Sequence, residues 1–265
     1  MKKMPTAQRV SHTDQSDNFV LARSVLAYRE AASRVHGRVL EIGTGTGYGT
    51  RIIAPAVTSL ITIDKFNAPS PQNPDLQNLH DLPNTEFRQM RVPPLRFPSC
   101  TFDCVISFQV IEHIRNDLAF MDEVWRVLKP AGRFIVTTPN APMSLTRNPW
   151  HVREYTACEF TGLVESRFGR VEAMGIFGNE RVMEYYDRNR EGVEAITRFD
   201  PLRLRDRLPR WILRLPYDVA NRLNRRRLLA AHDTLTRTLS PDDYHLAPIT
   251  PATSNPFDLF YIATK

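Results

Sequence analysis

The chain has 265 residues, is 42% hydrophobic and carries a formal net charge of +6. This length allows a full hydrophobic core, and no apolar run approaches the 18 or so residues of a membrane-spanning helix. The three cysteines, Cys100, Cys104 and Cys158, lack metal-finger spacing, and the Met-Lys-Lys start lacks the apolar stretch of a secretory signal. We therefore expect one cytoplasmic domain over residues 1–265, with reduced cysteines.

The first 37 residues predict a helical lead-in. From Asp17 to Val35 the chain carries an Ala/Leu/Val pattern that ends at Gly37, as a helix that stops at a glycine does. The core is expected to follow, over residues 38–177.

An apolar strand that enters a glycine-rich loop is the most specific signal in the chain. Val39 to Ile42 reads as a buried parallel strand, and glycine then occupies positions 43, 45, 47 and 49. Glycine lets a ligand lie against bare backbone. A dinucleotide loop needs a further glycine where this chain has Tyr48 or Thr50. The carboxylate of Glu41 would repel a pyrophosphate and would suit a cationic amino group, so a nucleotide-linked methyl donor is favoured over NAD.

The second strand, Ser59 to Asp64, ends in an acid that could accept hydrogen bonds from both hydroxyls of a ribose. Residues 67–83, rich in proline, asparagine and aspartate, predict a loop or broken helix without chemistry of its own. Thr85 to Gln89 reads as the third strand.

The segment from Phe102 to His113 reads as the fourth strand and its exit, and Glu112 and His113 leave the strand at its carboxyl end. The carboxyl ends of parallel strands border the ligand crevice of an open α/β sheet. Three interpretations of the Glu112–His113 pair stay open: a structural role at the strand exit, deprotonation of an acceptor, and metal binding.

A helix from residue 123 and a fifth strand, Phe134 to Thr138, lead to a loop rich in aromatic and ionisable residues: Trp150, His151, Arg153, Glu154 and Tyr155. This loop could line a substrate pocket or anchor itself to neighbouring elements. Beyond it we expect a helix at 156–168, a sixth strand at 170–176, an insertion at 178–255 on the substrate side, and a last strand within 256–265.

Arginine accumulates in residues 201–230 of the insertion. Nine arginines stand there against Asp206 and Asp218, a local charge of +7 that leaves −1 for the rest of the chain. Apolar residues recur among them at helical spacing: Leu208, Trp211, Ile212, Leu215, Val219 and Leu223. Pro209 suits a helix start and Pro216 predicts a bend.

Three interpretations of this segment remain. The favoured one is a lid helix whose apolar stripe packs on the domain while the arginines are solvated. The second is contact with an anionic membrane surface or an acidic lipid-linked substrate. Nucleic-acid binding is least favoured, because aromatic residues are few there and no RNA-binding module is recognisable.

The chain resembles the class I S-adenosylmethionine-dependent methyltransferases, whose first motif is Glu-x-Gly-x-Gly-x-Gly. The resemblance extends to an Ile-Glu-His exit at 111–113, a Lys-Pro-x-Gly turn at 129–132 and the strand at 258–264. It implies a Rossmann-like, doubly wound α/β fold: a seven-stranded, mostly parallel sheet with an antiparallel last strand and a helical insertion before it.

The resemblance also implies S-adenosyl-L-methionine as cofactor. Glu41 would face its methionine end and Asp64 its ribose. Gly43, Gly45 and Gly47 would face the backbone of the cofactor, and the region of Met90 its adenine. The acid that the family usually places after the third strand is missing, since the chain reads Gln89-Met90-Arg91 there. The expected cofactor-binding residues are Glu41, Gly43, Thr44, Gly45, Gly47, Asp64, Lys65, Met90, Arg91 and Phe108.

The expected reaction is transfer of a methyl group to a hydroxyl of a sugar, polyketide, quinone or lipid-linked compound. His113 or His151 would take the acceptor's proton, with Trp150, Arg153 and Tyr155 at the substrate. We expect no metal: ubiquinone-pathway O-methyltransferases bind a divalent ion with Glu-x-x-Glu-His, and Gln109 replaces the first Glu. The alternative is a non-catalytic protein that binds the cofactor or docks a partner or membrane through residues 201–230.

Overall fold

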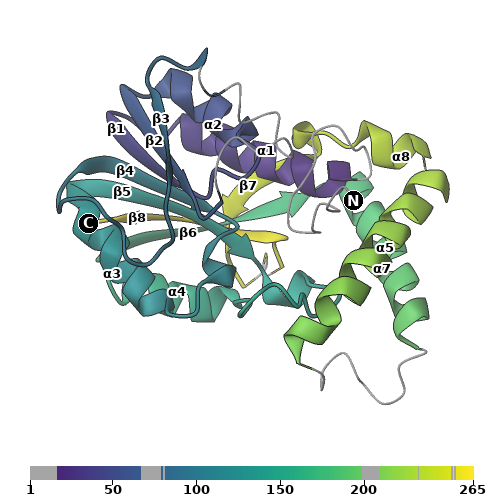
Figure 1. Cartoon of the computed structure of the whole chain (residues 1–265). Coiled ribbons are helices and arrows are strands. Elements are labelled where there is room, and N and C mark those ends of the chain that lie inside the picture. The colour runs from purple at the N-terminus through teal and green to yellow at the C-terminus, as the bar shows by residue number, and fades with distance from the viewer. Residues whose placement is uncertain are drawn as a thin grey trace.

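The computed structural model describes residues 17–66, 79, 81–198, 209–231, 233–251, 253 and 255–265, and these form a layered α/β structure around one mixed sheet (Figure 1). The eight strands lie in the order β3-β2-β1-β4-β5-β8-β6-β7. Their bounds are β1 Arg38–Ile42, β2 Ser59–Asp64, β3 Thr85–Gln89, β4 Phe102–Phe108, β5 Leu128–Pro139, β6 Arg170–Gly178, β7 Tyr244–Pro248 and β8 Asp258–Thr264. Strands β1 to β5 run parallel to one another, and β8 is antiparallel to both β5 and β6. The predicted fold class is confirmed.

The sheet has one strand more than the seven predicted. The additional strand, β7, pairs antiparallel with β6 at the sheet edge. It lies inside the stretch that was expected to be helical, and its five residues end in Pro248. A short edge strand with a proline carries almost no alternation signal. Its pairing and the hydrogen bond from the Tyr244 hydroxyl to the Phe19 carbonyl oxygen (2.7 Å) fix it instead.

Helices cover both faces of the sheet. On one face α1 and α2 pack with strand residues such as Val39 and Ile106, and on the other α3 and α4 pack with Leu40 and Val105. This division follows from the alternation of side chains along each strand. The helices are α1 Asn18–Ala32, α2 Tyr48–Ile53, α3 Asp117–Val127, α4 Ala157–Glu165, α5 Glu180–Thr197, α7 Arg210–Ala231 and α8 Asp233–Thr238.

The arginine-rich segment forms α7, which packs against α5 beyond the carboxyl ends of the central strands (Figure 1). Residues 201–208, which include Leu208, and most of the predicted 67–83 loop lie outside the described residues. The prediction that the apolar stripe packs on the domain is wrong in part, because Ile212, Val219 and Leu223 are exposed. Their spacing predicts a shared face, and a sequence pattern alone does not show which face the domain covers. In the described part of the chain, no helix is long and apolar enough to cross a membrane.

Helix α1 is held against the glycine loop by a close packing contact. A Cβ atom built on Gly49 in α2 would lie 2.0 Å from the Tyr28 ring of α1. That ring also contacts Phe108 edge-on, with centroids 4.7 Å apart. Only glycine leaves room for the ring at this position, so α1, α2 and the end of β4 meet at Tyr28.

The Gly49→Ala variant tests this contact. We expect it to lower the free energy of unfolding by about 2 kcal/mol, since overpacking a filled core forces side chains and backbone apart. Gly162→Ala in α4 is the matched control, because a Cβ there meets nothing within 4 Å, and it should stabilise the helix by roughly 0.5–1 kcal/mol. Urea unfolding of both variants measures the difference. Equal effects would contradict the packing account.

Candidate functional site

A cavity of about 830 Å³ opens at the carboxyl ends of the central strands. The strand order reverses between β1 and β4, and such a switch point is where open α/β sheets bind ligands. Its walls come from the loops that follow β1 to β5 and from one face each of α1, α5 and α7. The volume lies toward the upper end of the range for small-molecule sites, so it can accommodate two ligands side by side.

The loop after β1 brings bare backbone to the cavity wall. Gly43 and Gly45 have φ of 97° and 58°, a conformation that favours glycine. A Cβ on Gly43 would meet Val110 at 2.5 Å, whereas one on Gly45 would meet nothing within 4 Å. Gly43 therefore packs on the loop after β4, and Gly45 leaves open space on the cavity side.

Asp64 ends β2 at the cavity wall, and backbone groups fix its carboxylate. Oδ2 accepts from the Gly45 N–H (3.1 Å) and Oδ1 from the Phe66 N–H (3.0 Å). Beside it, the Met90 N–H donates to the Asp64 carbonyl oxygen (2.8 Å), which places Met90 at the wall. An oriented carboxylate next to a polarisable side chain suits a ribose and its base.

Glu41 differs from the expectation that it faces the methionine end of the cofactor. Its side chain is buried and is absent from the cavity lining. The carboxylate accepts hydrogen bonds from three hydroxyls: Tyr28 (2.9 Å), Thr50 (2.6 Å) and Thr62 (2.6 Å). Burial raises the pKa of Glu41, and the three hydrogen bonds oppose that shift. Glu41 thus ties together the elements around the glycine loop.

An ion pair in the cavity wall was not anticipated from the sequence. Arg23 of α1 lies 3.1 Å from the carboxylate of Asp258 at the start of β8, and both side chains are largely buried. Among the described residues, Asp258 Oδ1 has no hydrogen-bond partner. Burial raises the pKa of Asp258, and the Arg23 charge opposes the shift. The pair presents charges of both signs at the wall.

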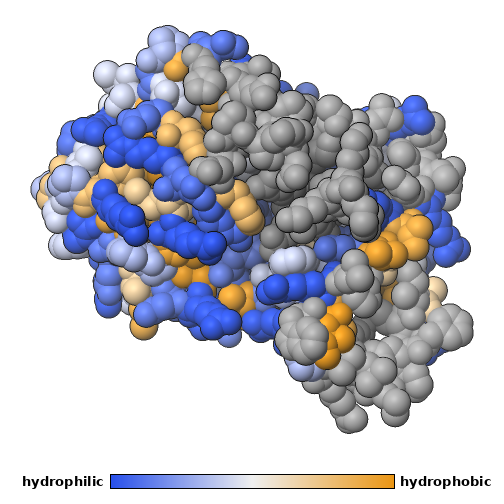
Figure 2. Space-filling model, viewed as in Figure 1, coloured by the Kyte–Doolittle hydropathy of each residue, from blue (hydrophilic) through white to orange (hydrophobic). Residues whose placement is uncertain are grey.

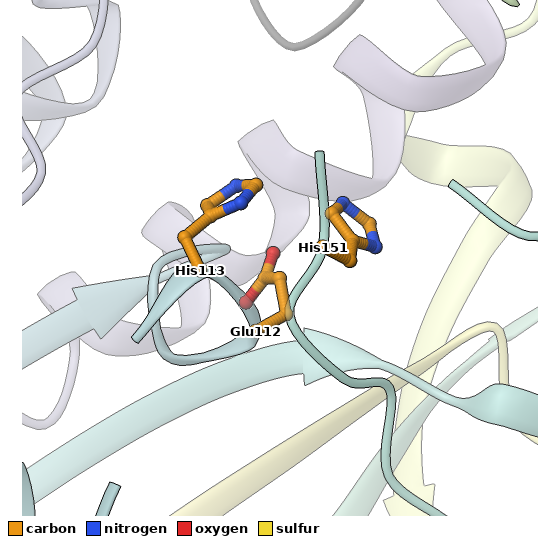
Figure 3. A group of neighbouring side chains, drawn as sticks. All are labelled: Glu112, His113 and His151. Atoms are coloured by element: carbon orange, nitrogen blue, oxygen red, sulfur yellow. The ribbon is translucent and has the colours of Figure 1, made fainter. Parts of the chain in front are cut away.

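Two histidines and a buried glutamate meet between the loops after β4 and β5 (Figure 3). The rings of His113 and His151 lie edge-to-face with centroids 4.9 Å apart, and the Glu112 carboxylate points between them. The backbone holds the two loops together, since the Val152 N–H donates to the Glu112 carbonyl oxygen (2.6 Å).

Burial governs the protonation of Glu112 and His113. Burial raises the pKa of Glu112 to about 7, although the charge of a protonated His151 would lower it. Burial and His151 lower the pKa of His113 to about 4. The neutral His113 donates from Nδ1 to the Trp150 carbonyl oxygen (3.0 Å), because a carbonyl only accepts. Its Nε2 therefore carries a lone pair.

His151 is held at both ring nitrogens. Nδ1 lies 2.6 Å from Glu154 Oε1, and Nε2 lies 2.9 Å from Asn148 Nδ2. The Asn148 amide is oriented by its Oδ1, which accepts from the Trp150 N–H (3.0 Å). Nδ1 must then be the donor to Glu154, and Nε2 an acceptor. A carboxylate behind one nitrogen with a lone pair on the other is the arrangement of a general base.

The same three residues could hold a metal ion. The ligand atoms of Glu112, His113 and His151 lie within 4.8 Å of one another. The expectation that no metal is used stays a prediction, and metal analysis of the purified protein tests it.

Trp150, Arg153 and Tyr155 differ from the expectation that they contact substrate, because none of the three lines the cavity. The Trp150 ring nitrogen donates to Asp218 of α7 (3.0 Å), and the Tyr155 hydroxyl and Arg153 guanidinium both donate to Asp117 of α3. The loop is therefore anchored by these side chains. The anchoring presents its other residues, His151 and Glu154, to the cavity.

The remaining predicted residues fall into two groups. Gly47 lies at the start of α2 outside the lining. The predicted residues that line the cavity are Gly43, Thr44, Gly45, Asp64, Lys65, Met90, Arg91, Phe108, His113 and His151. The insertion at 178–255, expected on the substrate side, supplies lining residues from α5 and α7 that the sequence did not single out: Tyr185, Tyr186, Asn189, Val193, Leu213, Tyr217, Ala220, Asn221 and Asn224. The sequence signal for this lining is a set of polar residues at helical spacing, and such a pattern fits a solvent-exposed helix face equally well.

Comparison with known proteins agrees with this geometry. The methyltransferase domain family matches residues 15–175. The chain belongs to this family. A probable S-adenosylmethionine-dependent methyltransferase of Mycolicibacterium smegmatis is 35% identical over 180 residues, which is 65% of this chain and 68% of that protein. A ubiquinone biosynthesis O-methyltransferase of Rhizobium etli is 28% identical over 109 residues, 40% of this chain and 42% of that protein.

The fold comparison points the same way. The structure of an S-adenosylmethionine-dependent methyltransferase from Thermotoga maritima superposes with a TM-score of 0.55 at 13% identity, covering 94% of this chain and 91% of that one. The methyltransferase therefore uses S-adenosylmethionine, as its relatives do. The residues fit this cofactor: Gly45 leaves open a space that any side chain would enter, and Asp64 stands beside it with an oriented carboxylate.

The raised pKa of Glu112 predicts a pH-dependent stability. Between pH about 4.5 and about 7 the unfolded chain releases this proton while the folded protein retains it, so the contribution of Glu112 to stability is full below pH 4.5 and is lost as the pH rises through 7. Glu112→Gln removes the titration. Relative to wild type, we expect the variant to gain about 2 kcal/mol between pH 5 and pH 8.

Urea unfolding at both pH values measures this gain, with Glu165→Gln, the loss of an exposed glutamate, as control. A stability difference between Glu112→Gln and wild type that is the same at pH 5 and pH 8 would contradict the buried environment of Glu112.

Proposed function

We propose that the methyltransferase transfers the methyl group to a hydroxyl of a small molecule, with His151 as the general base. The observation that carries this proposal is the chain Glu154–His151–Asn148, which makes Nε2 of a cavity-lining histidine a hydrogen-bond acceptor. A base is needed at an alcohol because its proton must leave as the carbon–oxygen bond forms. The Rhizobium etli relative, named as a ubiquinone O-methyltransferase, supports an oxygen acceptor.

The cofactor would lie along the glycine loop. The carboxylate of Asp64 would accept from the ribose hydroxyls. The neighbouring lining residues Lys65, Met90, Arg91 and Phe108 would surround the nucleoside, with Met90 and Arg91 at its adenine. Bound there, the cofactor supplies an electrophilic methyl group on a sulfonium. The protein's own contribution is to align the acceptor in line with that methyl group and to exclude water.

The zwitterionic end of the cofactor matches the Arg23–Asp258 pair. Arg23 would meet the carboxylate, and Asp258 would accept from the ammonium group. This assignment replaces the direct contact expected of Glu41, whose oxygens already accept from Tyr28, Thr50 and Thr62.

Proton transfer would use the groups around His151. The acceptor hydroxyl would take the place of the Asn148 amide at Nε2, its proton would move to Nε2, and the new carbon–oxygen bond would form as the carbon–sulfur bond breaks. Glu154 stabilises the resulting imidazolium through Nδ1. His113, kept neutral by burial, adds no competing positive charge.

A second candidate function, contact with an anionic membrane surface, is favoured by α7. Its outer side exposes Ile212, Val219 and Leu223, and Figure 2 shows orange apolar surface next to blue polar surface in this helical part of the molecule. Apolar residues interspersed with arginines suit a membrane interface. Flotation with vesicles of anionic phospholipid tests it: loss of binding in a Val219→Ser/Leu223→Ser variant supports the contact, and no binding by wild type refutes it.

The role of Asp64 predicts a specific binding defect. Asp64→Ala should weaken the binding of both S-adenosylmethionine and S-adenosylhomocysteine by about 10- to 100-fold, since hydrogen bonds to a charged group contribute roughly 1.5–3 kcal/mol. Asp242→Ala, which removes an exposed carboxylate, should leave affinity unchanged. Isothermal titration calorimetry measures both. Wild-type affinity in Asp64→Ala would refute the ribose contact.

The role of His151 predicts a loss of turnover without a loss of cofactor binding. His151→Ala should lower methyl transfer to a hydroxyl acceptor by about 10²- to 10⁴-fold, with Glu154→Gln intermediate and calorimetric cofactor affinity near wild type. Transfer of tritiated methyl from the cofactor, measured in a single turnover, checks this. If His151→Ala turns over at the wild-type rate, another group is the base.

A further inference from the structure

The wall of the cavity opposite the glycine loop is built from side-chain amides. Asn189 projects from α5, and Asn221 and Asn224 project from adjacent turns of α7. The Asn224 amide donates to Asn189 Oδ1 (2.6 Å), which bridges the two helices. Asn224 is 9% exposed and Asn189 and Asn221 are partly buried, so none of the three lies on a fully solvated helix face.

The helices are shaped to bring these amides together. A Cβ on Gly192 of α5 would lie 3.1 Å from Asn224 Oδ1, closer than nearly all real contacts of that kind. Glycine destabilises a helix interior relative to alanine. Its presence here lets α7 approach with the amide inward.

The amide bridge leaves part of the hydrogen-bonding capacity of these residues unused. Each amide carries two N–H donors and one carbonyl acceptor. The bond between the pair uses one N–H of Asn224 and a lone pair of Asn189. The NH₂ group of Asn189 and the Asn221 amide can therefore serve a ligand, with Tyr186 and Tyr217 in the same wall.

We infer that the acceptor is a polyhydroxylated molecule of the sugar class, an inference that rests on the proposed hydroxyl methylation. Neighbouring hydroxyls can both donate to and accept from an amide, and tyrosine rings offer flat surfaces to the C–H faces of a sugar ring. A quinone or polyketide face would leave amide groups of this wall unpaired, and an unpaired polar group away from water disfavours binding. A site built for hydroxyls rejects apolar analogues for this reason.

The experiment is saturation-transfer NMR on the full chain saturated with S-adenosylhomocysteine. The probes are methyl and octyl α-glycosides of glucose, galactose, mannose and rhamnose, with cyclohexanol as an alcohol that lacks neighbouring hydroxyls. We expect at least one glycoside to bind and cyclohexanol not to. Equal affinity of its methyl and octyl forms indicates a free sugar, and at least tenfold tighter binding of the octyl form indicates a lipid-linked one; both results support the inference.

Variants assign the binding to the amide wall. Asn221→Leu, a residue with no hydrogen bond in the described structure, should weaken glycoside binding at least tenfold while calorimetric affinity for S-adenosylhomocysteine stays at the wild-type value. Asn224→Leu should do the same, and Leu223→Ala, on the exposed side of α7, should bind as wild type.

Absence of binding by every glycoside, tighter binding of cyclohexanol, or unchanged binding in Asn221→Leu would overturn the inference. The proposed function fails separately: glycoside binding without methyl transfer would refute hydroxyl methylation and keep the amide-lined sugar site.

Discussion

The buried carboxylate of Glu41 is the interaction on which the site depends. Its three hydroxyl partners come from α1, α2 and β2, and Thr44 of the glycine loop joins them through a 2.6 Å contact with Thr62. Because an isolated buried carboxylate is strongly disfavoured, its partners must keep their positions. The network thus fixes the lead-in helix, the loop and the second strand relative to one another before any ligand binds.

This constraint divides the cavity into two sides with different chemistry. On the side of the glycine loop, backbone and the oriented carboxylate of Asp64 line the cavity, an arrangement that suits a nucleoside. On the side of α5 and α7, side-chain amides and tyrosines form the wall. His113 and His151 line the same cavity, so the proposed general base would stand where the two ligands would meet.

The sequence singles out lining residues of the first side one by one, whereas it predicts the second side only as an insertion at 178–255, and the reason is physical. Gly43 and Gly45 have a positive φ that favours glycine, and Asp64 ends the adjacent strand. Residues with such local roles can be recognised in a sequence by their type and spacing. The amide wall depends on how α5 and α7 pack, which no local pattern encodes. The loop after β5 shows the same limit: its ionisable residues were recognised, but only the contacts of Arg153 and Tyr155 with Asp117 show which side chains turn away.

The central claim is that the glycine loop, fixed in place by Glu41, holds the cofactor with its sulfur toward His151. A crystal structure with S-adenosylhomocysteine tests this claim most directly. The account predicts the ribose hydroxyls within hydrogen-bond distance of Asp64, the amino-acid end at Arg23 and Asp258, and the sulfur facing His151. A nucleoside bound away from Asp64, or reversed so that the adenine lies against His151, would contradict it.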